Sequence, residues 1–253
     1  MNKQYRELEC LRADVARMNL ELKSRDEFLA AAAHELKTPV AATKLKLQTG
    51  LRILRQSAKG EVSQETLLEL FRDGDHQMSR LTRLIDNLLD LSRANSGKLL
   101  LQLESCDLGE LIAEVCDRYS RQITHAKSFL KIEVEAGLVG RWDRDRLDQV
   151  LSNLLTNAVR HAPGSTISVG AQRLDATVQI VVKDEGPGIS LVRQERIFER
   201  CEHPSFQSGD RGMGLGLYIT REIVLAHQGS IWVKSQAWSG AAFHVSLPLS
   251  LHL

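Results

Sequence analysis

A short alanine-rich stretch near the N-terminus carries the residue best suited to nucleophilic chemistry, His34. A helix here, at about 100° per residue, directs His34 to the solvent side, opposite the apolar face. That apolar face consists of Leu29, Ala32, Leu36 and Val40. Glu35 can keep one ring nitrogen protonated and leave the other with a free lone pair, and Pro39 can bend the helix one turn later. A lone exposed histidine usually does nothing, so its role depends on the rest of the chain.

Two asparagines one helical turn apart form a second candidate group. The predicted helix Arg144 to Arg160 buries one apolar edge and places Asn153 and Asn157 together on its flank. Amide oxygens suit magnesium, a hard ion that keeps several waters and is usually held jointly with nucleotide phosphates. Such a pair is also common on solvated surfaces, and the pair alone leaves both interpretations open.

A predicted strand, Val178 to Lys183, leads directly into Asp184-Glu-Gly186-Pro-Gly188-Ile189. The Asp184 carboxylate can accept a hydrogen bond from an exocyclic amine such as that of adenine. The glycines allow positive φ and let the backbone approach a flat ring. An ordinary Asp/Gly turn is the alternative for this segment alone.

Further along, Gly212, Gly214 and Gly216 open an amphipathic helix, with Leu215 and Leu217 between and after them. Such a junction exposes backbone N–H groups at the positive end of a helix dipole and suits phosphates. Its spacing fits neither a dinucleotide fingerprint nor a Walker loop. The polar stretch 201–210 before it predicts a mobile lid.

Together and in this order, these stretches resemble the signature of the sensor histidine kinases. His34-Glu35-Leu-Lys-Thr38-Pro resembles the phosphoacceptor motif, and residues 148–161 resemble the N-box. Residues 184–189 resemble the adenine-contacting box, and residues 196–200, with Phe198, resemble the F-box. The glycine box then completes the Bergerat (GHKL) nucleotide fold that histidine kinases share with gyrase-like ATPases and related chaperones.

The resemblance implies specific roles. His34 is the phosphoacceptor, Asn157 the main Mg²⁺ ligand and Asn153 its support. The residues implied to contact ATP are Asn153, Asn157, Arg160, His161, Asp184, Gly186, Gly188, Ile189, Phe198, Gly212, Gly214, Leu215, Gly216 and Leu217. Glu35-Leu-Lys-Thr38 also resembles the motif of kinases that dephosphorylate their partners, with Thr38 orienting a water. Alternatively, Thr38 bonds to the backbone beside Pro39.

The elements that must position these residues begin with helices. Apolar residues spaced three and four apart from Leu8 to Leu29 predict a coiled coil, or else one amphipathic helix packed on its own domain. The first helix should continue to about Gln56 and turn near Gly60, and a second helix should end near Gly97. We therefore expect a signalling helix over residues 1–24. A helical hairpin over 25–97 should form a dimeric four-helix bundle.

Residues 98–253 change character and predict an α/β sandwich in which helices cover one face of a mixed sheet. Strands are expected at 99–103, 129–134, 166–170, 178–183, 229–233 and 242–247, and helices at 108–123, 144–160 and 215–226. The overall fold class is thus α plus α/β, a helical hairpin followed by a Bergerat-type sandwich.

Composition narrows the setting. The 253 residues contain 33 Lys+Arg and 32 Asp+Glu, so the net charge of +1 gives no global field for nucleic acid or anionic membranes. Four cysteines without Cys-x-x-Cys spacing argue against zinc or a disulfide framework and suit a reducing cytoplasm. No apolar run approaches the roughly 20 residues of a membrane span, so we expect a soluble, cytoplasmic chain.

The resemblance implies ATP- and Mg²⁺-dependent autophosphorylation on His34, followed by transfer to an aspartate of a separate response regulator. A homodimer is expected, with an upstream sensor domain or protein possible. A non-catalytic dimeric scaffold of the same fold is the alternative. A gyrase-type ATPase is disfavoured, because its nucleotide box resembles this one with a glutamate where Asn153 stands.

Overall fold

The structure of the chain is a computed structural model that describes residues 15, 18, 30, 32–34, 36–55, 64–95, 99–199 and 215–250. The described residues form two compact units, one ending at Asp86 and the other beginning at Asn87. This division falls inside a long helix and does not test the domain boundaries predicted from the sequence, which stay predictions. No helix within the described residues is both long and apolar enough to cross a lipid bilayer.

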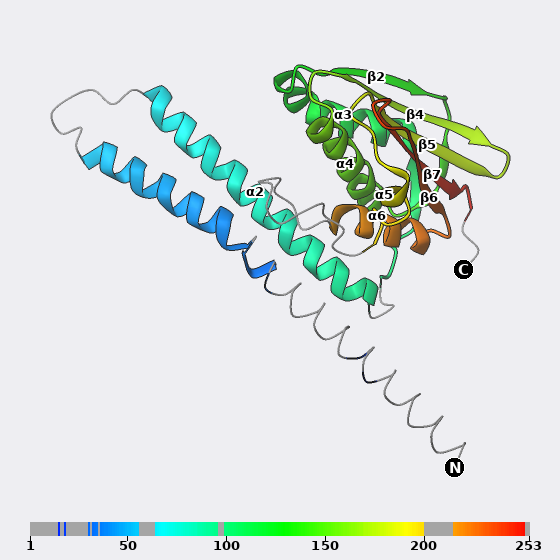
Figure 1. The fold of residues 1–253 in the computed structure, drawn as a ribbon, viewed down its shortest axis with the longest axis horizontal. Helices are drawn as coiled ribbons and strands as arrows, with labels where there is room; N and C mark the ends of the chain where they lie inside the picture. Colours follow the sequence, from blue (N-terminus) through cyan, green and yellow to red (C-terminus); the bar gives the residue numbers. More distant parts are fainter. Residues whose placement is uncertain are drawn as a thin grey trace, which may run out of the picture. The chain divides into compact units, whose positions relative to one another are not determined.

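The first unit contains two helices that lie side by side (Figure 1). One covers residues 36–55, with residues 30 and 32–34 also helical, and the other is α2, Gln64–Asn95. An ion pair joins Lys46 to Asp73, and a Cβ on Gly50 would lie 3.9 Å from Cδ1 of Leu70. The two helices therefore run antiparallel, which confirms the predicted hairpin. The predicted turn near Gly60 lies outside the described residues.

Large apolar side chains remain exposed on both helices of this hairpin. In the single chain these are Leu45, Leu47, Leu51 and Leu54 on the first helix and Leu68, Phe71, Met78 and Ile85 on α2. Exposed apolar stripes of this kind on a helix pair are usually buried against another protein surface. Of the predicted coiled-coil segment, only Val15 and Met18 are described, and both are helical and exposed.

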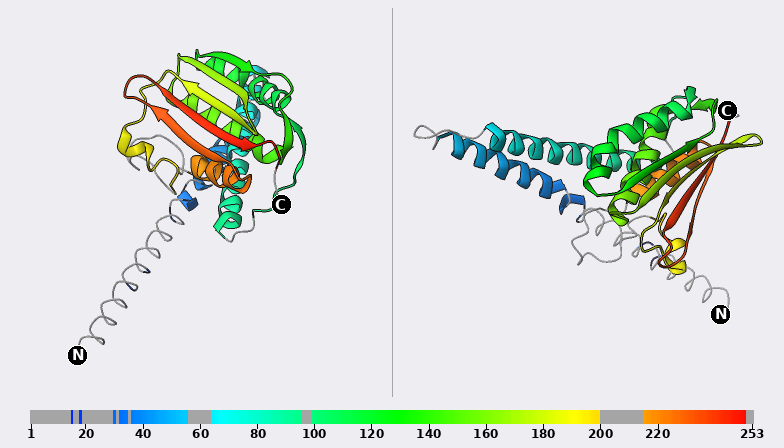
Figure 2. Two further views of the ribbon diagram at one scale, coloured as in Figure 1. Left: turned by 90° about the vertical axis from the view of Figure 1, so that its right-hand side faces the viewer. Right: turned by 90° about the horizontal axis from the view of Figure 1, so that it is seen from above.

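The second unit is built on a five-stranded mixed sheet with strand order β2-β4-β5-β7-β6 (Figures 1 and 2). The strands are β2 (Phe129–Val134), β4 (Thr166–Leu174), β5 (Thr177–Asp184), β6 (Ser230–Ser235) and β7 (Ala241–Pro248). β2 runs parallel to β4, and the remaining pairs are antiparallel. A separate antiparallel pair joins β1 (Glu104–Asp107) to β3 (Val139–Trp142).

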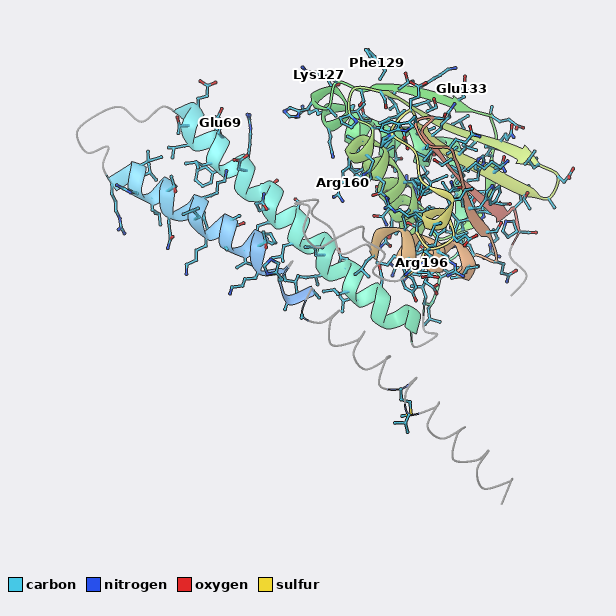
Figure 3. All side chains as sticks on the ribbon, viewed as in Figure 1. Glu69, Lys127, Phe129, Glu133, Arg160 and Arg196 are labelled. Atoms are coloured by element: carbon cyan, nitrogen blue, oxygen red, sulfur yellow. The ribbon has the colours of Figure 1, made fainter. Side chains whose placement is uncertain are left out.

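Three helices cover one face of this sheet (Figure 2). They are α3 (Leu108–His125), α4 (Arg144–His161) and α6 (Leu215–Ala226), and α5 (Leu191–Gln194) is a single turn. Alternate residues of β4, β5 and β7 are buried toward the helices because side chains alternate faces along a strand. Phe129 and Glu133 of β2 point away from the helix side (Figure 3). This arrangement confirms the predicted sandwich.

The predicted elements agree with the structure except at the start of this unit. The strand expected at 99–103 is wrong, because residues 99–103 have no regular structure and β1 begins at Glu104. The backbone N–H of Gln102 donates to Oδ2 of Asp143 at 2.8 Å instead of joining a strand ladder. The short elements β3 and α5 were not predicted, since neither offers more than four residues of pattern.

Candidate nucleotide site and phosphoacceptor

Asp184 lies at the end of the buried row of β5, after Val178, Ile180 and Val182. A carboxylate at a position otherwise apolar is costly unless hydrogen bonds compensate for it. The backbone N–H of Gly186 donates to Oδ1 at 2.8 Å, and a backbone hydrogen bond from Ala241 also favours the charged form. Burial outweighs these and raises the pKa of Asp184, while the nearby His161 lowers it. The Asp184 side chain is therefore only 6% exposed and is held in place as a hydrogen-bond acceptor.

The loop after Asp184 packs tightly against the end of α4. A Cβ on Gly186 would lie 2.9 Å from Cβ of Ala162 and 3.1 Å from the carbonyl oxygen of His161. Gly188 has φ +74°, and a Cβ there would lie 2.0 Å from the carbonyl oxygen of Gln236. Glycine is therefore required at both positions, by close approach at the first and by backbone conformation at the second.

The turn between β6 and β7 holds this loop from the other side. The hydroxyl of Ser235 accepts the N–H of Ile189 at 2.8 Å and donates to the carbonyl of Gly240 at 2.6 Å. Gln194 of α5 donates to the carbonyls of Ile189 at 2.7 Å and Ser235 at 2.9 Å. The N–H of Trp238 donates to the carbonyl of Pro187 at 2.7 Å. Ile189 thus lies in a loop fixed by several hydrogen bonds.

Asn153 connects α4 to the first turn of α6. Its Nδ2 donates to the carbonyl of Gly216 at 3.3 Å and lies 3.4 Å from Oγ1 of Thr220. Because the amide nitrogen faces α6, the amide oxygen is the atom left to accept from a ligand or bind a cation. Asn157 is half-buried one turn further along the same flank. The donor set of this flank, neutral amide oxygens, fits a hard cation shared with phosphates.

The end of α4 brings two more predicted contacts to the same region. Arg160 and His161 are both exposed, and Arg160 projects from α4 (Figure 3). The effect of His161 on the pKa of Asp184 places its ring within electrostatic reach of that carboxylate. A basic side chain beside the glycine loop could bind a polyphosphate, and an imidazole can stack on a ring or donate a hydrogen bond.

The remaining predicted ATP contacts are only partly described. Leu215 is buried, whereas Gly216 and Leu217 are half-buried in the first turn of α6. Phe198 makes an edge-to-face contact with Phe243 of β7, with ring centroids 6.3 Å apart. Gly212 and Gly214 lie outside the described residues, as does the stretch 201–210 that was predicted to be a lid.

His34 belongs to the first unit and is exposed on its helix. The hydroxyl of Thr38 donates to the carbonyl of His34 at 3.1 Å, which is the backbone bond of the alternative interpretation. Ala32 and Pro39 are buried, Leu36 is half-buried and Val40 is 48% exposed. Leu29 and Glu35 lie outside the described residues. An exposed imidazole on a helix is free to meet an electrophile from solvent.

Within the second unit, α4 contacts two elements that are far from it in sequence. Asn153 on its flank bonds to the first turn of α6, and its C-terminal end packs against the glycine loop after Asp184. The sequence indicated all three but missed Ser235, Gln194 and Gly240, which hold the loop. Gly240 in a polar turn was a usable signal for a hairpin. Nothing in the sequence of that turn indicates that it would hold the loop at Ile189, which lies 46 residues before Ser235.

Two family models match the chain. Residues 24–97 match the His Kinase A (phospho-acceptor) domain, and residues 142–251 match the histidine kinase-, DNA gyrase B- and HSP90-like ATPase. The chain belongs to the sensor histidine kinase family. His34 lies in the first match, and the Asp184 loop, Asn153 and Gly216 lie in the second. The second of these is an ATP-binding domain.

Named sensor kinases align with nearly all of this family member. The adaptive-response sensory kinase SasA of Thermosynechococcus vestitus is 32% identical over 246 residues, which is 96% of this chain and 65% of SasA. The alginate biosynthesis sensor protein KinB of Pseudomonas aeruginosa is 36% identical over 240 residues, 93% of this chain and 39% of KinB. The chain therefore spans only part of the length of these relatives.

The fold also matches a solved kinase. The structure of histidine kinase ThkA in complex with response regulator protein TrrA superposes with a TM-score of 0.59 and 24% identity, over 88% of this chain and 61% of that chain. This likeness establishes the shared fold.

Proposed function

We propose that this chain is the catalytic core of a protein-histidine kinase that uses ATP to phosphorylate His34. The observation that carries the proposal is that α4 bonds to the first turn of α6 through Asn153 and packs against the Asp184 loop at its C-terminal end, so that one helix joins the predicted nucleotide contacts. An exposed histidine in a phosphoacceptor domain supplies the nucleophile on the same chain. Each part has a distinct task in phosphoryl transfer.

In the proposed reaction, the Nε2 lone pair of His34 attacks the γ-phosphorus of ATP. A P–N bond forms as the bond between the γ-phosphorus and the bridging oxygen breaks, and ADP leaves with that electron pair. Phosphoryl transfer depends on positioning and charge neutralisation more than on covalent help from the protein. Glu35 is proposed to hold the other ring nitrogen of His34 protonated.

Adenine is proposed to bind against the glycine loop. Asp184 would accept the hydrogen bond of the exocyclic amine, since its carboxylate is buried and fixed by backbone N–H groups. Gly186, Gly188 and Ile189 would lie along the ring. Phe198 would border the site.

The phosphates are proposed to lie between α4 and the first turn of α6. The residues that would face them are Arg160, His161, Gly212, Gly214, Leu215, Gly216 and Leu217. Asn157 would bind Mg²⁺ with Asn153 in support, because amide oxygens suit this ion. Magnesium would supply positive charge to the triphosphate when bound.

The phosphoryl group is proposed to pass from His34 to an aspartate carboxylate of a response regulator. The P–N bond breaks and a carboxylate oxygen forms the new P–O bond. ThkA was solved with a response regulator, and its likeness in fold supports such a partner. Thr38 is proposed to orient a water for the reverse dephosphorylation. ATP as substrate favours a cytoplasmic location.

The partner that covers the exposed apolar stripes is proposed to be a second copy of the chain. Leu47, Leu51 and Leu54 face solvent on one helix, and Phe71, Met78 and Ile85 do so on the other. Two hairpins would bury these stripes in a four-helix bundle. Residues 1–24 are proposed as a coiled-coil signalling helix, 25–97 as the dimerisation and phosphotransfer domain and 98–253 as the ATP-binding domain.

The proposal is tested by replacing the metal ligand. Asn157→Ala should slow phosphorylation by on the order of 10²-fold and weaken its dependence on magnesium, because charge neutralisation at the phosphates is lost. The rate is followed with γ-labelled ATP, with Asp145→Ala on the exposed side of the same helix as the control. An unchanged magnesium dependence would contradict the ligand role. No nucleotide-induced thermal shift and no acid-labile phosphate in the native chain would favour the non-catalytic scaffold.

A further inference from the structure

His227 follows the last residue of α6 and is completely buried. The backbone N–H of Asp143 lies 3.0 Å from Nε2, and Nδ1 lies 2.8 Å from the carbonyl oxygen of Ile223. A backbone N–H can only donate, so Nε2 must be the acceptor and the single ring proton must sit on Nδ1. Both ring nitrogens are then satisfied, and the imidazole is neutral. Burial lowers the pKa of His227 and favours the same form, while Asp143 and the Ile223 carbonyl act in the opposite direction.

Asp143, the residue that bonds to His227, also makes several other hydrogen bonds. Asp143 is the N-cap of α4, and its Oδ1 accepts the N–H of Arg146 at 3.1 Å. Oδ2 accepts the N–H of Gln102 at 2.8 Å, and the Asp143 carbonyl accepts the N–H of Leu147 at 3.0 Å. Since its own N–H goes to His227, every polar group of this buried residue is used. A shift of His227 would therefore move the start of α4.

α4 and α6 are thus tied to each other at two places. At the start of α6, Asn153 bonds to the Gly216 carbonyl, and the buried Thr220 hydroxyl donates to the same carbonyl at 2.8 Å. At its end, His227 bonds to Asp143. Ten residues separate the ties on α4 and eleven on α6, which is about 15 and about 16 Å of helix. The ties match in spacing, so the helices run antiparallel in fixed register.

We infer that His227 is a positioning residue which, through Asp143, fixes α6 along α4 and so keeps the first turn of α6 against Asn153 at the nucleotide site. This inference rests on the proposed nucleotide site and adds a residue remote from it. His227 touches no ligand in this account. Its neutral ring is required, because a protonated Nε2 would face another N–H donor.

Three variants of the full chain test the inference through ADP affinity. His227→Phe keeps a ring but leaves the Asp143 N–H unpaired, and we expect the Kd for ADP to rise roughly 3- to 10-fold. His227→Gln keeps an acceptor near Nε2 and should restore the Kd to within about twofold of the native value. His244→Phe replaces a half-buried histidine of β7 that stacks on Trp232, and it should leave the Kd unchanged. A native Kd in the His227→Phe variant, or no rescue by Gln, would overturn the inference.

A second measurement needs no nucleotide. Nitrogen-15 correlation spectra of the nucleotide-free chain should show His227 as the neutral Nδ1–H tautomer at pH 7. The Asp143 amide should exchange slowly with solvent in the native chain and in His244→Phe, and faster in His227→Phe. An Nε2–H tautomer, a charged ring or equal exchange in all three would contradict the tie. If the native chain shows the tautomer but binds no ADP, the proposed function fails while the His227 tie stands.

Discussion

Asp184 is the residue where the fold and the proposed function make opposite demands. Burial raises its pKa above the ordinary 3.8. A carboxyl with a raised folded-state pKa contributes stability only while protonated. This contribution is complete below pH 3.8 and is lost as the pH rises through the raised pKa. The charged carboxylate therefore opposes folding, whereas the proposed bond to adenine requires a carboxylate that can accept.

Asp184→Asn should separate these two effects. Its amide oxygen can still accept the Gly186 N–H, but its NH₂ group would face the amine of adenine, so the Kd for ADP should rise at least tenfold. The Tm of the nucleotide-free protein at pH 8 should stay equal or increase, because the buried charge is gone. Asp175→Asn, in the exposed β4–β5 turn, is the matched control. A lower Tm together with native ADP affinity would refute this account of Asp184.

Thr38 carries a prediction about dephosphorylation of the regulator. Its bond to the His34 carbonyl does not decide between its two possible roles, because Thr49 and Thr82 make the same bond to the carbonyl four residues earlier. Thr38→Ala should keep autophosphorylation and phosphotransfer near native rates and lose most dephosphorylation of the phosphorylated regulator. Thr49→Ala should change neither. If kinase and phosphatase rates fall together in Thr38→Ala, or neither falls, Thr38 is structural.

Among individual residues, those whose role depends on their immediate neighbours in the sequence could be predicted. Asp184 ends an alternating apolar strand, and the glycines after it require close approach, so their pattern is readable along the chain. Ser235 and His227 could not be predicted in the same way. Their partners, Ile189 and Asp143, lie 46 and 84 positions away, and only the folded sheet and helices bring them together.

Among the elements, the last turns of α2 combine burial with charge. Asp90 is 4% exposed, and its Oδ2 accepts from Nη1 of Arg146 at 2.6 Å and from Nε2 of Gln149 at 2.8 Å. All three residues lie in the second compact unit. α2 therefore ends against α4, and the ion pair ties the two helices. Such pairs are costly to break because the remaining charge loses its partner.

Asp90→Ala should lower the free energy of unfolding of the second unit by about 2 kcal/mol, less than for a fully buried pair because Arg146 keeps some exposure to water. All three tryptophans, Trp142, Trp232 and Trp238, lie in this unit, so their fluorescence in urea follows its unfolding. Asp117→Ala, at an exposed position of α3 in the same unit, should lower this free energy of unfolding by less than about 0.5 kcal/mol, the size usual for surface substitutions. Equal losses in both variants would contradict a role for the ion pair.

Elements with long periodic patterns were predictable, and short ones were not. The helices α3, α4 and α6 and the five strands of the main sheet follow their apolar periods. The leucine-rich segment 99–103 reads as a strand by composition, yet strand formation needs a partner. The partner strand β3 pairs with residues 104–107 and not with residues 99–103, and the pairing begins with Glu104 opposite Trp142. Pairing between distant segments is decided by the tertiary fold.

The whole molecule combines two units that carry different parts of the proposed reaction. The first carries the exposed His34, the proposed nucleophile, and the second is the ATP-binding domain. We expect neither unit alone to have the proposed activity, because His34 lies in the first unit and the proposed ATP contacts among the described residues lie in the second. The order of motifs along the chain predicts this division of roles, which stays a prediction. The contacts that hold each unit together came only from the structure.

The most direct measurement is the location of the phosphate after incubation with ATP and magnesium. The native chain and His125→Gln, a change at the exposed end of α3, should both acquire one phosphate that acid removes and alkali preserves. Peptide mass spectrometry at alkaline pH should place it on His34. His34→Gln should show the native thermal shift with ADP and no such phosphate. Persistent acid-labile labelling of His34→Gln would contradict the assignment of His34 as the phosphoacceptor.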